Sequence, residues 1–101
     1  MKRLFISQPM SGKTTKEIVA VRDAAIASAK EKLGEDVVVI PSFFQGYEEL
    51  HPLKLLSMAI SKLAEADVAY FAPGWEDARG CRIEHQCAIN YGIDILEDFC
   101  C

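Results

Sequence analysis

Short apolar runs alternate with longer amphipathic stretches along the whole of the 101-residue chain. Runs that are apolar at consecutive positions suit strands buried on both faces, and such strands belong to parallel sheets covered by helices. Apolar residues spaced three and four apart suit helices with one buried face. The predicted strands are Lys2–Ser7, Val37–Ile40, Val68–Ala72 and Ile93–Leu96; the predicted helices are Ile18–Leu33, Pro52–Ala66 and a third that carries Glu84 and ends at Gly92.

The order of these elements predicts a single α/β domain over residues 1–101. Right-handed crossovers then produce a small doubly wound, flavodoxin-like or Rossmann-like parallel four-stranded sheet with helices on both faces. The inward stripes of the three helices are expected to be Ile18, Val21, Ala25, Ile26, Ala29 and Leu33; Leu53, Leu56, Ile60, Leu63 and Ala64; and Ile83, Glu84, Cys87, Ala88 and Tyr91.

The composition excludes several classes of protein. Half of the residues are apolar and 26% are charged, which is typical of a globular domain rather than a disordered one. The net charge of −4 gives no electrostatic reason to expect binding to polymeric nucleic acid. No apolar run approaches the roughly 20 residues of a membrane span, and the first strand follows Met1 without a signal-peptide core. We therefore predict a cytoplasmic protein with no nucleic-acid or membrane partner.

The cysteines predict neither a disulfide framework nor a metal centre. Cys81, Cys87, Cys100 and Cys101 form no Cys-x-x-Cys pair and suit the reduced thiols of a cytosolic protein. Cys81 and His85 are spaced i, i+4 and are an alternative pair of metal ligands. Two ligands without a second cluster make a poor zinc site, so we predict no metal and no cofactor.

The connections between the elements differ in length, and the difference predicts where a ligand binds. Helix-to-strand connections are minimal, whereas strand-to-helix connections span Gln8–Lys16, Pro41–His51 and Pro73–Arg79. Only the long connections lie at the carboxyl ends of the strands, where open parallel sheets bind their ligands. The second of them is aromatic and is expected to cover the ligand site or pack in a subunit interface through Phe43, Phe44 and Tyr47.

Glu84 places a carboxylate on the apolar stripe of the third helix, within its first two turns and near that same edge. An ionised side chain is rarely buried without a partner or a chemical role. We therefore predict that Glu84 is the catalytic residue. The alternative is a structural ion pair with Arg79, Arg82 or Arg22.

The loop after the first strand is a predicted ligand-binding segment, because polar groups near a helix start can hold a phosphate or a sugar hydroxyl. Gly12-Lys13-Thr14 also suggests a P-loop, but Ser7 replaces the required first glycine and Pro9 removes a backbone donor. The remaining alternative is a turn in which Thr14 or Thr15 caps the helix. The predicted contacts are Ser7, Gln8, Pro9, Met10, Ser11 and Gly12.

The segment before Glu84 supplies a second set of predicted ligand contacts. An aromatic ring beside carboxylates and arginines suits a base-plus-sugar ligand, since the ring stacks and the charged groups bond to hydroxyls. The alternative is a solvated loop with local ion pairs. His51, which precedes Pro52, is expected to cap or flank the second helix. The predicted contacts in this segment are Trp75, Asp77, Arg79 and Gly80.

Three motifs together resemble the nucleoside 2-deoxyribosyltransferase superfamily, in particular its small bacterial and phage relatives of unassigned function. They are the first strand with Ser7-Gln8-Pro9-Met10-Ser11-Gly12-Lys13, the segment Ala66-Asp67-Val68, and Gly80-Cys81-Arg82-Ile83-Glu84 followed by Ala88. The resemblance implies that Glu84 attacks the anomeric carbon of a nucleoside, expels the base and holds the sugar covalently until a second base or water takes it. It also implies an oligomer. The tyrosine and aspartate typical of active members fall at Phe5 and Ala59.

These observations predict an enzyme that transfers or hydrolyses the N-glycosidic bond of a nucleoside or nucleotide, with Glu84 as nucleophile. One alternative is a non-catalytic module that binds a nucleotide or nucleoside metabolite, because Phe5 and Ala59 replace the expected helper groups. Another is an interaction subunit that keeps only the fold. Apolar residues on the outer side of the second helix favour a homo-oligomer, a dimer or higher, and they are Leu55, Met58 and Ala59.

Overall fold

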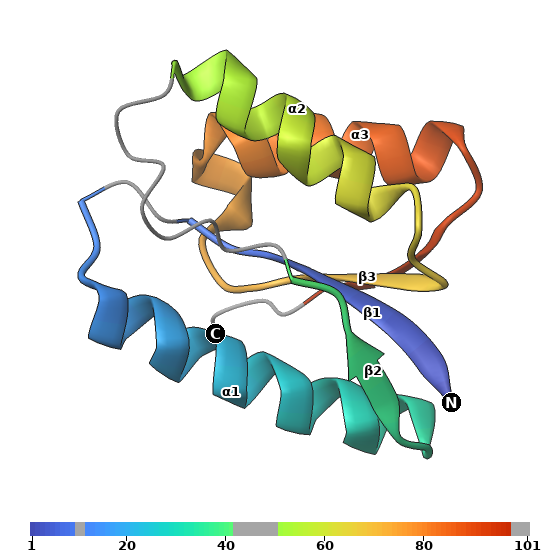
Figure 1. Ribbon diagram of the computed structural model, residues 1–101. Coiled ribbons are helices and arrows are strands. Elements are labelled where there is room, and N and C mark those ends of the chain that lie inside the picture. Colours follow the sequence, from blue (N-terminus) through green and yellow to red (C-terminus); the bar gives the residue numbers. More distant parts are fainter. Residues whose placement is uncertain (10–11, 42–50, 98–101) are drawn as a thin grey trace.

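A computed structural model describes residues 1–9, 12–41 and 51–97 of the chain. Strands and helices alternate along it, as the apolar pattern predicts (Figure 1). The strands are β1 (Lys2–Ser7), β2 (Val37–Val39), β3 (Val68–Phe71) and β4 (Asp94–Glu97). The helices are α1 (Thr15–Leu33), α2 (Pro52–Leu63) and α3 (Arg79–Asn90), with a 3₁₀ turn, η1 (Trp75–Asp77), before α3.

The four strands form one parallel sheet in the order β2-β1-β3-β4. The central strand β1 pairs Leu4 with Val39 of β2 and with Val68 of β3, and its last residue, Ser7, pairs with Phe71. The chain first adds β2 next to β1 along one edge of β1, and later adds β3 along its opposite edge. The direction in which strands are added therefore reverses between β1 and β3. Such a switch point opens a crevice at the carboxyl ends of the strands.

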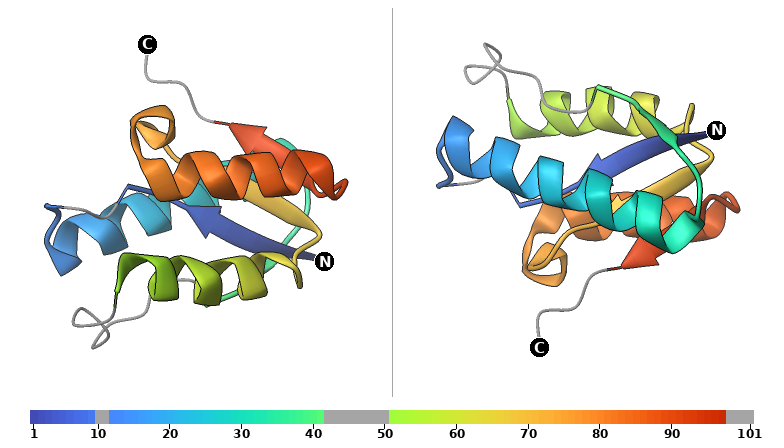
Figure 2. Two further views of the ribbon diagram at one scale, coloured as in Figure 1. Left: turned by 90° about the horizontal axis from the view of Figure 1, so that it is seen from above. Right: turned by 90° about the horizontal axis from the view of Figure 1, so that it is seen from below.

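The sheet separates two apolar layers, with α1 on one face and α2 and α3 on the other (Figures 1 and 2). Alternate residues of each strand point to opposite faces. The α1 layer is built on Leu4, Ile6, Ala25, Ala29, Val68, Tyr70 and Ala72. The opposite layer is built on Phe5, Leu63, Ala69, Phe71 and Ala88. The predicted doubly wound α/β fold is therefore confirmed.

Local signals fix both ends of α1. Thr14 caps the helix through a bond from the Glu17 backbone N–H to its hydroxyl oxygen (3.2 Å), and the Glu17 carboxylate accepts the Thr14 backbone N–H (3.4 Å). This capping box starts the helix three residues before the predicted Ile18. Gly34 ends it in the left-handed conformation, with φ 69°. The predicted helix cap at Thr14 is thus confirmed.

The inward faces of α2 and α3 differ from the predicted stripes. Leu53 is 66% exposed because it lies in the first turn of α2, beyond the edge of the sheet, and Ala64 is exposed just after the helix ends. Tyr91 is 83% exposed because it follows the end of α3. Ile83 is exposed as well, and Cys81 takes its place in the buried row with Glu84 and Ala88. Ala59, expected on the outer side of α2, packs against the inner core.

The remaining differences are at element ends, which shift by one to three residues as fraying ends commonly do. Strands β2 and β3 each end one residue earlier than predicted, and β4 is displaced by one residue. Helix α2 ends at Leu63 rather than Ala66. Within residues 1–9, 12–41 and 51–97, no helix is long and apolar enough to cross a membrane.

Candidate active site

A cleft of about 1200 Å³ opens at the carboxyl ends of the central strands, where the switch point predicts a ligand site. Its floor is the end of β1, and its walls are the start of α2 and the start of α3. Charged and polar groups line one part and apolar groups of α2 line another. Among the lining residues are Phe5, Ser7, Gln8, Lys13, His51, Leu56, Ala59, Asp77, Arg79, Gly80, Cys81 and Glu84.

Glu84 lines this cleft from the second turn of α3 and is only 7% exposed. The 3₁₀ turn η1 carries the chain over the sheet edge, so that α3 begins at Arg79 with Cys81, Glu84 and Ala88 on its buried face. The hydroxyl of Ser7, at the end of β1, donates a hydrogen bond of 2.7 Å to Oε1 of Glu84. The predicted catalytic carboxylate is thus buried against the sheet beside the cleft.

The environment of Glu84 favours its neutral form. Burial raises the pKa of Glu84 to about 7, and the hydrogen bond from Ser7 opposes part of that rise. In the described part of the chain, no ion pair joins Glu84 to Arg79 or Arg82, and the Arg82 guanidinium donates to the Glu76 carbonyl oxygen (3.2 Å). Glu84 therefore lacks those two predicted ion-pair partners, and the hydroxyl of Ser7 donates a hydrogen bond to its carboxylate.

Cys81 lies one turn before Glu84 and also lines the cleft, although it is only 4% exposed. Burial raises the pKa of Cys81 to about 11; a hydrogen bond with Ser7 lowers it and the nearby Glu84 charge raises it further. The group is therefore a thiol at neutral pH and a poor nucleophile. Cys81 and Cys87 are both free.

The first loop contributes three of its six predicted contacts to the cleft. Ser7, Gln8 and Pro9 line it, whereas Gly12 does not, and Met10 and Ser11 lie outside the described residues. Gln8 is 5% exposed, and its Oε1 has no hydrogen-bond partner among the residues that the structure describes.

The P-loop alternative is not supported by the geometry of this loop. In the first turn of α1 the backbone N–H of Glu17 is bonded to the side chain of Thr14, whereas a P-loop would leave this group open to phosphate. Lys13 and Thr15, on either side of this cap, line the cleft.

Trp75 does not line the cleft, in contrast to the prediction that it stacks on a ligand. The 3₁₀ turn directs its ring back over the sheet, where it stacks on His85 with 4.2 Å between ring centroids. Phe71 packs against the same two rings. His85 Nε2 lies 2.8 Å from Oε1 of Glu97. None of the three rings lines the cleft, so this aromatic cluster is separate from the predicted ligand site. Asp77, Arg79 and Gly80 do line the cleft.

Cys81 and His85, the alternative pair of metal ligands, have other partners. His85 belongs to the cluster with Trp75 and Glu97, whereas Cys81 faces Ser7 and Glu84. Among residues 1–9, 12–41 and 51–97, no group of three or more His, Cys, Asp or Glu side chains is placed to hold a metal ion.

His51 and the α2 side chains line the cleft but were absent from the predicted contacts. Nδ1 of His51 accepts the Leu53 backbone N–H (3.1 Å), so the expected helix cap is confirmed. Leu56 was assigned to the inward face of its helix because an apolar residue at a cleft has the same pattern as one in a core, and Ala59 was assigned to the outer side of that helix. The predicted covering residues Phe43, Phe44 and Tyr47 lie outside the described part of the chain.

The fold and the site together define a small doubly wound α/β domain with a buried carboxylate in its switch-point cleft. A family profile described as a domain of unknown function (DUF4406) matches residues 2–97, and the chain belongs to this family. No curated protein and no solved structure matches the chain.

Proposed function

We propose that the protein transfers or hydrolyses the N-glycosidic bond of a nucleoside or nucleotide, with Glu84 as nucleophile. The observation that carries the proposal is a carboxylate, only 7% exposed, that lines a cleft at the switch point of the sheet. The cleft, of about 1200 Å³, has room for a ligand of this size. The resemblance of the motif around Glu84 to nucleoside 2-deoxyribosyltransferases is the second support.

The chemistry requires two displacements at one carbon atom. The ionised carboxylate of Glu84 attacks the anomeric carbon and forms a sugar ester as the bond to the base breaks. The electron pair of that bond leaves with the base, which takes up a proton from water. Water or a second base then attacks the same carbon, gives up its proton to the hydroxide formed in the first step, and releases the Glu84 carboxylate. The anomeric configuration is therefore retained, and the second attacking group decides between hydrolysis and transfer.

The burial of Glu84 suits this role. Its pKa of about 7 leaves a substantial ionised fraction at neutral pH, and that fraction is poorly solvated and ready to stabilise positive charge on the sugar. Because only the ionised form attacks, we expect the rate of base release to rise with pH through about 7.

A second candidate function is binding without chemistry. Phe5 and Ala59 both line the cleft, and they stand where the resemblance implies a tyrosine and an aspartate that assist the reaction. Their apolar side chains can neither orient a sugar hydroxyl nor protonate a leaving base. The same cleft would then hold a nucleotide or nucleoside metabolite as a sensor or a store.

The two candidates differ in their response to Glu84→Gln. The purified protein is incubated with a panel of 2′-deoxynucleosides and their 5′-monophosphates, and free base is followed by chromatography. If the protein is an enzyme, we expect base release at a rate that Glu84→Gln reduces by about a thousandfold or more. If it is a binding module, we expect no base release. The ligand should then raise the melting temperature of wild type and of Glu84→Gln alike.

Glu97→Gln is the matched control for these experiments. It also converts a partly buried glutamate, but one that bonds to His85 and does not line the cleft. Base release that is equally fast in wild type, Glu97→Gln and Glu84→Gln would contradict the proposed reaction.

We further propose that the protein acts on small molecules in the cytoplasm and assembles as a homo-oligomer. The support for assembly is apolar surface at the ends of α2 and α3, where Leu53 is 66% and Tyr91 83% exposed. Light scattering of the purified protein tests it, and a mass equal to one 11.2 kDa chain would contradict it.

A further inference from the structure

The two carboxylate oxygens of Glu84 are not equivalent. Oε1 accepts the Ser7 hydroxyl at 2.7 Å. In the described part of the chain, Oε2 accepts no hydrogen bond from any side chain or backbone group. A hydrogen bond reduces the nucleophilicity of the oxygen that accepts it, so the oxygen free to form a bond with a ligand is Oε2.

Ser7 is fixed more firmly than a typical ligand contact. It is the last residue of the central strand, paired with Phe71, and its carbonyl oxygen accepts the Ala72 backbone N–H at 2.9 Å. The residue is 2% exposed. The sheet therefore fixes the position of the hydroxyl, and the hydroxyl in turn fixes one oxygen of a side chain that belongs to a different element, α3.

The Ser7 hydroxyl has one proton and two neighbours that compete for it, Glu84 and Cys81. The hydrogen bond with Ser7 lowers the pKa of Cys81, which is the effect of a hydroxyl that donates to the sulfur, but burial keeps Cys81 as a neutral thiol that competes only weakly for the serine proton. That arrangement leaves the serine proton for Glu84. Cys81 and Glu84 are three residues apart, so both lie on the same face of α3.

We propose that Ser7 is a positioning residue, which holds Oε1 of Glu84 and presents Oε2 to the anomeric carbon. The proposal rests on the proposed function for the reaction itself, and it replaces the sequence-based assignment of Ser7 as a ligand contact. The contact with Glu84 is measurable without any substrate.

Removal of the hydroxyl has a definite sign. A hydrogen bond donated to a carboxylate stabilises the ionised form, so its loss raises the pKa of Glu84 further. The ionised fraction at neutral pH then falls, and the remaining carboxylate is free to rotate. Both effects lower turnover, whereas substrate affinity is expected to stay the same, because the proposed role of the Ser7 hydroxyl is toward Glu84 and not toward the ligand.

The first test is a ¹³C NMR titration of the Glu84 carboxyl group in wild type, Ser7→Ala, Ser7→Thr and Cys81→Ala. We expect Ser7→Ala to raise the midpoint by about one pH unit. Ser7→Thr keeps the hydroxyl and restores the wild-type midpoint, while Cys81→Ala shifts it less than Ser7→Ala does. A midpoint that is the same in wild type and Ser7→Ala would overturn the proposal, whatever the protein catalyses.

The second test is kinetic, on the substrate that releases base fastest. We expect Ser7→Ala to lower kcat by about tenfold at pH 7, to move the acidic limb of the pH profile upward, and to leave KM within about twofold. If instead KM rises while kcat and the acidic limb of the pH profile stay the same, Ser7 is a ligand contact and the proposal is overturned. If the midpoint moves but wild type releases no base, the positioning contact stands and the proposed reaction fails.

Discussion

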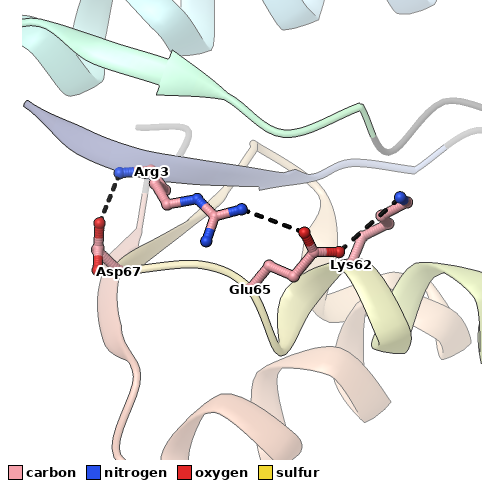
Figure 3. Close-up of polar contacts among 4 residues, drawn as sticks. All are labelled: Arg3, Lys62, Glu65 and Asp67. Atoms are coloured by element: carbon pink, nitrogen blue, oxygen red, sulfur yellow. Dashed lines mark hydrogen bonds and ion pairs between the residues drawn. The ribbon is translucent and has the colours of Figure 1, made fainter.

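Arg3 at the amino edge of the sheet and Glu84 at its carboxyl edge differ in how their charges are satisfied. The Arg3 backbone N–H donates to Oδ2 of Asp67 (2.8 Å), and its guanidinium donates to Oε1 of Glu65 (3.1 Å). Lys62 lies 3.8 Å from the other oxygen of Glu65, so the exposed charges of Arg3, Lys62 and Glu65 each have an opposite charge nearby (Figure 3). Glu84 is buried and bonded to one neutral hydroxyl.

The difference indicates that the charges at the amino edge suit folding, whereas the buried carboxylate at the carboxyl edge needs another explanation. Exposed ion pairs at the amino edge keep their solvation and close a short turn between α2 and β3. Burial of the Glu84 carboxyl group disfavours its ionised form, and a neutral residue of the same shape would avoid the penalty. The presence of Glu84 in one cleft with Gln8, whose Oε1 has no partner among the described residues, therefore points to a function at the carboxyl edge.

The largest expected effect is the pH dependence of stability that Glu84 causes. The pKa of Glu84 is about 7 in the folded protein, above the usual value of 4.5 that the unfolded chain is expected to show. Between these two pKa values the folded state binds a proton that the unfolded chain has lost. The contribution of Glu84 to the free energy of unfolding is therefore fully present below pH 4.5 and is lost as the pH rises through 7. The expected loss is on the order of 3 kcal/mol.

Urea unfolding of wild type and Glu84→Gln at intervals from pH 5 to 8 measures this loss. Subtraction of the two curves removes the contribution of the histidines and the amino terminus, which both proteins share. The free energy of unfolding of wild type should fall relative to Glu84→Gln across this window. Parallel curves would mean that Glu84 has an ordinary pKa, and the contrast between the two edges would be lost.

The fold was predictable from the sequence because its signals are local and repeated. The unbroken β-branched run at Val37, the glycine after Leu33 and the proline that opens α2 each determine one boundary. The carboxyl-edge position of Glu84 followed from unequal loop lengths. The predicted carboxylate, with Ser7, Gln8 and Asp77, does line one cleft.

The details that failed depend on tertiary packing. Trp75 was predicted to contact a ligand, but a 3₁₀ turn, which has no strong sequence signature, directs its ring onto His85. Tyr91 continues the helical stripe in sequence but lies beyond the last turn of α3. The bond between Ser7 and Glu84 joins residues 77 positions apart, and neither spacing nor composition reports such a contact.

At the amino edge, the largest single effect is expected from Asp67→Ala. The Asp67 carboxylate accepts the backbone N–H of Arg3, and Asp67 also donates its own backbone N–H to the Arg3 carbonyl oxygen. The substitution leaves a strand N–H to water alone, and we expect a loss of about 1 kcal/mol in the free energy of unfolding. Asp67→Asn keeps an acceptor oxygen and should lose less. Chemical denaturation of wild type and both variants measures these losses. Equal losses in the two variants would show that the charge of Asp67, and not its hydrogen bond, stabilises the fold.

At the carboxyl edge, we expect Gln8→Met not to destabilise the protein, in contrast to Asp67→Ala. The Gln8 amide oxygen is buried without a partner among the described residues, and methionine has nearly the same shape with no polar group. We therefore expect the free energy of unfolding to stay the same or to rise by up to about 1 kcal/mol. The unfolding midpoint in urea measures it. A clear destabilisation would mean that Gln8 has a structural partner, and its place in the ligand site would need another basis.

The smallest expected effect is that of Glu65→Ala, although Glu65 faces two cations in Figure 3. The side chains of Arg3 and Glu65 are 50% and 45% exposed, so water screens their attraction and holding both long side chains in place opposes it. We expect a loss below about 0.5 kcal/mol that disappears in 1 M salt. Denaturation at low and high salt tests this, with Lys62→Ala as the control that leaves the Arg3 contact intact. A loss as large as that of Asp67→Ala would mean that the exposed pair, and not the backbone hydrogen bond, secures the amino edge.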